Sequence, residues 1–271
     1  MKRRDFIALL AGYLLISFSC IAHAICNPSL VRLLDRGDKF VQIRSGNAPR
    51  LGTYFIRWFG HSSFLIQSGS QTKVITDPNF NVTPGIQADA VTVSNDHYTH
   101  NNIETVSGNP LILRGISLQQ TWNPIRTQVK DITIANIPSQ RGPGYEEVAN
   151  SIFIYHMGRL CIAHLGNIGH LLTPEQEKFM QRVDIMMIPI DARNNLGFED
   201  LVKVIEQVRP PIVIPMHYDD PSQADLFASF IRDRYAIRRI KGSELHLSRS
   251  VLPKSTEIFI LTHPHPIFPW E

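Results

Sequence analysis

Charged residues are scarce and scattered in this chain of 271 residues. Asp, Glu, Lys and Arg make up 19% of it, the formal net charge is +3, and no stretch gathers five basic residues. Nucleic-acid-binding proteins usually concentrate Lys and Arg on one surface. The sequence therefore predicts no nucleic-acid partner. Its hydrophobic content of 43% is ordinary for a folded protein, and its length allows one large domain or two small ones.

Long apolar runs are absent except near the N-terminus. Lys2, Arg3 and Arg4 precede an apolar run over 6–18, and the small-residue pattern Ala-His-Ala follows at 22–24. This order is typical of a cleavable signal peptide, and the run is too short to span a bilayer comfortably. We expect residues 1–24 to be removed during export to the periplasm or the outside, leaving no stable membrane span.

The route of export and the state of the cysteines both stay open. Residues 3–7 read Arg-Arg-Asp-Phe-Ile, which is similar to a twin-arginine signal, although an ordinary secretory signal also fits. Only Cys26 and Cys161 of the three cysteines would remain in the mature chain. They could pair in an oxidising compartment, but the apolar run at 160–163 favours Cys161 as a small buried strand residue.

The order of apolar and turn residues predicts a mixed α/β domain without internal repeats. Residues 25–50 form an N-terminal extension with a possible helix at 29–34, the domain covers 51–250, and 251–271 form a C-terminal tail. In the first part of the domain we expect strands at 55–59, 63–66, 73–76, 90–94, 111–113, 132–137, 151–156 and 159–163. In the second part we expect strands at 184–190, 212–214 and 244–247 and helices at 198–208 and 222–234.

Two local patterns carry further expectations. Thr173 followed by Pro174 and by Gln176 predicts a capped helix start. The His-Pro-His-Pro sequence at 263–266 could suggest metal binding, but its prolines favour an extended, exposed tail.

Five histidines stand in loops or at the ends of apolar strands, where a sheet presents reactive groups to solvent. They are His61, His97, His100, His164 and His217. The spacing of three between His97 and His100 lets both reach one metal ion if the loop turns tightly. The pair alone is weak evidence for a metal.

Six ordered motifs between about residue 55 and residue 246 resemble the metallo-β-lactamase superfamily, in the branch of the ascorbate-6-phosphate lactonases and N-acylphosphatidylethanolamine phospholipase D. They are Trp-Phe-Gly-His-Ser-Ser at 58–63, Thr-Asp-Pro at 76–78, Ser-Asn-Asp-His-Tyr-Thr-His at 94–100, Pro-Ser-Gln-Arg at 138–141, His-Leu-Gly-Asn-Ile-Gly-His at 164–170, and Ile-Pro-Met-His-Tyr at 214–218. The resemblance implies an α/β fold, a four-layer αββα sandwich, and metal-dependent hydrolysis of an ester, lactone or phosphodiester.

The same resemblance implies that the metal site is only partly kept. The family pattern has seven ligands for two metal ions. Three of them correspond here to His97, His100 and His217. The other four positions hold Asn95, Thr99, Arg141 and Asn167. Both carboxylates are missing, and Arg141 puts a permanent positive charge where a cation should lie.

We therefore expect one zinc ion at most, held by His97, His100 and His217. His61 or His164 could be a fourth ligand or a supporting residue, while Asp77 and Asp96 could orient the imidazoles.

The alternative is a non-catalytic relative with a metal-free pocket. Arg141 would then anchor a small anionic molecule, such as a carboxylate or phosphate, in a pocket lined by Asn95 and Asn167.

Overall fold

The computed structural model describes residues 52–80, 85–141, 148–193 and 195–264. The expected signal segment, the extension with its helix at 29–34, and Cys26 lie outside these residues. Among the helices of the described part, none is both long and apolar enough to cross a membrane.

The first sheet has six strands in the order β13-β1-β2-β3-β4-β5. It is mixed: β1, β2, β3 and β13 pair antiparallel, whereas β3-β4 and β4-β5 are parallel. Its strands are β1 Tyr54–Gly60, β2 Ser63–Gln67, β3 Lys73–Thr76, β4 Ala90–Val93, β5 Leu111–Arg114 and β13 Glu244–Leu247.

The second sheet has eight strands in the order β12-β14-β11-β10-β9-β8-β7-β6. The neighbouring strands β12, β14, β11, β10 and β9 are parallel to one another. The strands β6, β7, β8 and β9 form an antiparallel meander. Its strands are β6 Arg126–Val129, β7 Ile132–Gln140, β8 Val148–Met157, β9 Leu160–His164, β10 Ile185–Pro189, β11 Ile212–Met216, β12 Ala236–Ile240 and β14 Glu257–Leu261.

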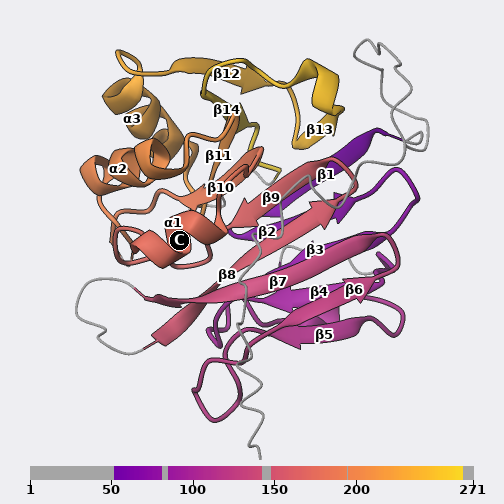
Figure 1. Cartoon of the computed structure of the whole chain (residues 1–271). Helices are drawn as coiled ribbons and strands as arrows, with labels where there is room; N and C mark the ends of the chain where they lie inside the picture. Colours follow the sequence, from indigo (N-terminus) through magenta and orange to yellow (C-terminus); the bar gives the residue numbers. More distant parts are fainter. Residues whose placement is uncertain (1–51, 81–84, 142–147, 194, 265–271) are drawn as a thin grey trace, which may run out of the picture.

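Three α-helices connect the parallel strands and gather beside the β9–β12 part of the second sheet (Figure 1). They are α1 Pro174–Phe179, α2 Phe198–Val208 and α3 Pro221–Ile231. Thr173 and Gln176 form the expected capping box at α1. The apolar stripe of α2 is buried as predicted, because residues three and four apart share one face of a helix.

The main core lies between the two sheets. Trp58 and Phe64 from the first sheet and Phe153 and Tyr155 from the second are fully buried in it. A smaller apolar cluster under the connection after β3 includes Ile75 and Val91, and the 3-10 helix η2 Ile103–Thr105 packs beside it. The predicted fold class is confirmed, since the chain forms an α/β sandwich of two mixed sheets.

The predicted tail boundary at residue 250 is wrong. Strand β14 lies between β11 and β12, so the domain continues to at least Leu261. The expectation of an exposed tail also fails at His263, whose ring lies 5.0 Å from that of Trp58 and 5.9 Å from that of Tyr218. The strand at β12 was missed because its Ala-Ile-Arg-Arg-Ile sequence lies at the sheet edge and is largely exposed, which leaves little apolar signal.

Cys161 lies in β9 and is 2% exposed, which matches the expected buried strand position. It is nevertheless disulfide-bonded and not the free thiol that its apolar surroundings suggested. Its partner lies outside the described residues.

Candidate metal centre

Three histidines from distant parts of the chain meet at one edge of the sandwich. His61 follows β1, His100 follows β4, and His217 follows β11. One ligand nitrogen from each lies within 4.8 Å of the other two. His100 and His217 are buried, with their Nε2 atoms 3.2 Å apart, and 12% of the His61 side chain is exposed. We call these three residues the histidine triad.

The backbone of the triad is held in an uncommon conformation. His61 has φ 49° and His217 has φ 62°, in the left-handed region that side chains other than glycine rarely adopt. The backbone N–H of His217 donates to the carbonyl oxygen of His61 at 2.9 Å, and Trp58 Nε1 donates to the same oxygen at 3.0 Å. Such strain persists only where surrounding contacts fix it, and it is common at functional sites.

Asp77 orients His100. Its Oδ2 lies 2.7 Å from His100 Nδ1, while Ser94 donates to both carboxylate oxygens, through its backbone N–H and its hydroxyl, at 2.6 Å each. Because Nδ1 faces the carboxylate, Nε2 points towards the other histidines. This is the arrangement in which a carboxylate fixes the tautomer and orientation of a metal-binding imidazole.

The other two members of the triad repeat the arrangement. His217 Nδ1 lies 3.4 Å from Asp191 Oδ2, and Asn195 donates to the other oxygen of Asp191 at 2.7 Å. His61 Nδ1 lies 3.6 Å from Asp219 Oδ1. Each imidazole therefore turns Nδ1 towards a carboxylate and leaves Nε2 for a shared centre.

Burial disfavours the charged form of the inner histidines. It lowers the pKa of His100 well below its ordinary value, and the neighbouring His217 and His61 act in the same direction. Burial also lowers the pKa of His217, and the nearby Asp191 opposes this effect in part. Neutral imidazoles keep a free lone pair, which is the form that binds metal ions.

The triad fits one divalent ion. Zinc–nitrogen distances of about 2.0–2.1 Å in a tetrahedral site imply about 3.3 Å between ligand nitrogens. The spacing of His100 Nε2 and His217 Nε2, 3.2 Å, matches this value. His61 Nε2 is buried and has no hydrogen-bond partner among the described residues. A buried polar atom without a partner needs an explanation, and an ion supplies one.

The predicted ligand His97 is not part of the triad. Its Nδ1 lies 2.8 Å from the hydroxyl of Thr99, and its ring centroid is 6.3 Å from that of His100. Burial and the charge of Arg141 both lower the pKa of His97. The structure thus brings together two of the three predicted ligands and adds His61, which was expected only as a possible fourth.

Two further predicted pocket residues, Asn95 and Asp96, lie in the loop after β4. Asn95 is buried, accepts from the backbone N–H of His97 and donates to Ser94. Asp96 does not orient an imidazole as expected; it accepts hydrogen bonds from Asn101 and Gln120 and holds its own loop.

His164 supports the centre without joining it. Its Nε2 lies 2.9 Å from the carbonyl oxygen of Ser62, and its Nδ1 accepts from the backbone N–H of Gly166. Both ring nitrogens are therefore engaged by the backbone, which leaves none for a metal ion.

Asn167 lies in a tightly packed turn. It is 2% exposed, its Oδ1 has no hydrogen-bond partner among the described residues, and its backbone N–H donates to Asn150 Oδ1. Gly166 before it has φ +56°, and a Cβ there would lie 2.3 Å from Asn150 Oδ1 and 2.7 Å from Ser94 Oγ.

We expect Gly166→Ala to destabilise the protein by about 2–4 kcal/mol, from left-handed strain and overpacking together. Asn150 cannot give way easily, because it is fully buried and bonded at both ends of its amide. Gly197→Ala is the matched control, since its Cβ would meet nothing within 4 Å. Urea unfolding of both variants measures the difference, and equal midpoints would refute the tight packing.

Asp191, Asp219 and Asn195 were missed from the sequence. A usable signal existed for both carboxylates, because Asp191 comes two residues after the end of the buried strand β10 and Asp219 comes two residues after His217. Strand ends that meet at one edge of a sheet bring such residues together.

The comparisons with known proteins agree with this geometry. The model of the β-lactamase superfamily domain matches residues 55–217, which is more than half of the chain. The chain belongs to this family. A UPF0173 metal-dependent hydrolase of Heliobacterium modesticaldum is 26% identical over 227 residues, covering 71% of this chain and 93% of the relative. Another from Methanosarcina mazei is 23% identical over 192 residues, covering 60% and 83%.

Two solved structures share the fold of this chain. One from Thermotoga maritima superposes with a TM-score of 0.61 at 24% identity and covers 77% of this chain and 98% of its own. Igni18, a metallo hydrolase of Ignicoccus hospitalis, superposes with a TM-score of 0.54 at 17% identity. The match covers 79% of this chain and 97% of Igni18. At these identities the likeness concerns the fold alone.

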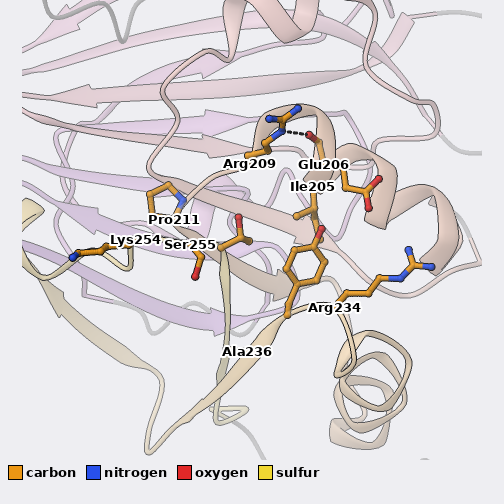
Figure 2. A pocket seen from close by; sticks show the side chains of 10 residues that line it. Ile205, Glu206, Arg209, Pro211, Arg234, Ala236, Lys254 and Ser255 are labelled. Carbon is orange, nitrogen blue, oxygen red and sulfur yellow. Dashed lines mark hydrogen bonds between the residues drawn. The ribbon is translucent and has the colours of Figure 1, made fainter.

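A separate cavity of about 480 Å³ lies away from the triad. Its lining includes Pro211 and Ala236, at the starts of β11 and β12, whereas His217 follows the end of β11. A five-residue strand separates these ends by roughly 16 Å. Figure 2 shows the charged ends of Arg209 and Arg234 at separate places, with Arg209 Nε donating to the carbonyl oxygen of Glu206, so the two do not converge on one ligand.

Proposed function

We propose that this β-lactamase superfamily protein is a metal-dependent hydrolase that holds one zinc ion on His61, His100 and His217. The observation that carries the proposal is that Nδ1 of each ring lies within 3.6 Å of a carboxylate oxygen, while one ligand nitrogen from each ring lies within 4.8 Å of the other two. Three imidazoles favour zinc over the oxygen-binding ions magnesium and calcium. The relatives named metal-dependent hydrolases support the same assignment.

A single ion agrees with the charges at this edge of the sandwich. Within the part of the chain that the structure describes, the triad is the only group of three His, Cys, Asp or Glu residues whose ligand atoms lie close enough to share one ion. Asn95, Thr99 and Asn167 bring no negative charge, and Arg141 brings a positive one. A second divalent ion would lack the carboxylates that offset its charge.

The substrate that we propose is an ester, lactone or phosphodiester with an anionic group. A bound zinc ion supplies Lewis acidity and lowers the pKa of water in such sites. The protein contributes the triad that holds the ion, the carboxylates that orient the triad, and Arg141, whose charge acts on His97, as a partner for the anion.

Removing the metal should abolish hydrolysis. We expect zinc-loaded protein to cleave at least one member of a panel of chromogenic carboxylic esters, lactones and phosphodiesters. Protein treated with a chelator and dialysed should lose this activity about a hundredfold or more and regain it with one equivalent of zinc. Undiminished cleavage by chelated protein would refute the proposed metal dependence.

A second function, binding of an anion without catalysis, is favoured by the positive charge of Arg141, which acts on the neighbouring-loop residue His97. The same panel separates the two, because a binding protein would take up carboxylates or phosphates without zinc and cleave nothing. Replacing Arg141 by Gln should then remove the binding.

A further inference from the structure

The segment after β14, which begins with Thr262 and His263, is hydrogen-bonded to the rest of the domain. The backbone N–H of Thr262 donates to the carbonyl oxygen of Gly242 at 3.0 Å, and its hydroxyl donates to that of Ile240 at 2.9 Å. These bonds place the next residue, His263, against the end of β1. The segment lies beyond residues 55–217, the stretch that the family model matches.

His263 completes a cluster of three rings. Its ring meets that of Trp58 edge-on, with centroids 5.0 Å apart, and lies 5.9 Å from the ring of Tyr218. Trp58 and Tyr218 are themselves 5.0 Å apart. Trp58 is fully buried and Tyr218 is 4% exposed, so His263 covers the side of two large rings that would otherwise lack this contact.

The ring cluster is attached directly to two members of the triad. Trp58 Nε1 donates to the carbonyl oxygen of His61, and the backbone N–H of His217 donates to the same oxygen. Tyr218 follows His217 in the chain. A shift of either large ring therefore moves the strained backbone of His61 or of His217.

We propose that His263 is a positioning residue for the metal centre: by packing on Trp58 and Tyr218 it fixes the spacing of His61 and His217. This inference rests on the proposed function, in which His61 and His217 bind one ion. His263 does not touch the ion itself, and its ring packing, not its charge, carries the role.

Three variants test the packing role. His263→Ala removes the ring, and His263→Phe keeps an aromatic ring in its place. His246→Ala is the matched control, because His246 also makes a ring contact with β1, 4.9 Å from Phe55, but has no contact with the triad. Zinc affinity is measured by competition with a chromophoric chelator, and the visible spectrum of the cobalt-substituted protein reports the ligand geometry.

We expect His263→Ala to weaken zinc binding about tenfold, which is the lower end of the range for residues that support metal ligands, and to alter the cobalt spectrum. The zinc affinity of His263→Phe should stay within about threefold of that of the original protein. The zinc affinity of His246→Ala should equal that of the original protein. Unchanged affinity and an unchanged spectrum in His263→Ala overturn the proposal.

Hydrogen exchange in the metal-free protein separates this inference from the proposed function. We expect the amide of His217, which donates to His61, to exchange about tenfold faster in His263→Ala than in His246→Ala. If the original protein binds no zinc, the proposed function fails, and this comparison still decides the positioning role. Equal exchange rates in the two variants would count against it.

Discussion

Replacing His100 by alanine should reduce zinc binding by about 3 kcal/mol, roughly a hundredfold. Zinc sites with four ligands contribute about 10–16 kcal/mol of binding free energy, so one ligand accounts for about a quarter of it. His100 is fully buried, and its Nε2 lies 3.2 Å from His217 Nε2, at the spacing of two ligands of one ion. Calorimetric titration of metal-free protein with zinc measures the change.

His156→Ala is the control for this prediction. His156 lies in β8, pairs with Cys161 across the sheet and is not part of the triad. The His156→Ala variant should bind zinc with the same affinity as the original protein. Because the alanine at residue 100 also removes a hydrogen bond to Asp77, the melting temperature of each metal-free variant is recorded alongside. An affinity in His100→Ala equal to that of the control would exclude His100 as a ligand.

Replacing Asp77 by asparagine should have the second-largest effect, on stability and on metal binding together. Asp77 is 1% exposed and accepts three hydrogen bonds, two from Ser94 and one from His100. An amide offers one acceptor oxygen and an NH2 group, so at least one buried donor would face another donor. We expect a loss of about 2–4 kcal/mol in unfolding free energy.

Zinc affinity of the same variant should fall about tenfold to a hundredfold, because the orientation and tautomer of His100 depend on the carboxylate. Asp89→Asn is the matched control. Asp89 also accepts a backbone hydrogen bond, from Lys73, and forms an ion pair with Lys130, but it lies outside the centre. Urea unfolding and zinc titration of the pair test both effects; a stable Asp77→Asn with full affinity would contradict the assigned role.

The parts of the fold that depend on local sequence were predicted well. Helix α2 and the capping box of Thr173 follow from residues close together in the chain, and both are confirmed. Strand β14 was assigned to the tail instead, because its place between β11 and β12 depends on pairing with segments distant in sequence. Apolar pattern alone does not reveal such pairing.

The site shows the same division between local and distant information. The motif order identified His100 and His217, but the position of His97 depends on its hydrogen bond to Thr99, which turns its Nδ1 to that hydroxyl. Asp191 and Asp219 each stand close after a strand end in the sequence, but only the fold shows that they face His217 and His61. Ligand types can be read from the chain, whereas the convergence of their lone pairs is a property of the folded backbone.

In the proposed centre three imidazoles, each facing a carboxylate, bind one zinc ion. Crystals of zinc-loaded protein, measured on both sides of the zinc absorption edge, test it most directly. We expect one anomalous peak per chain, about 2.0–2.1 Å from the Nε2 atoms of His61, His100 and His217. Two peaks, or a single peak held by His97 in place of His61, would contradict the account.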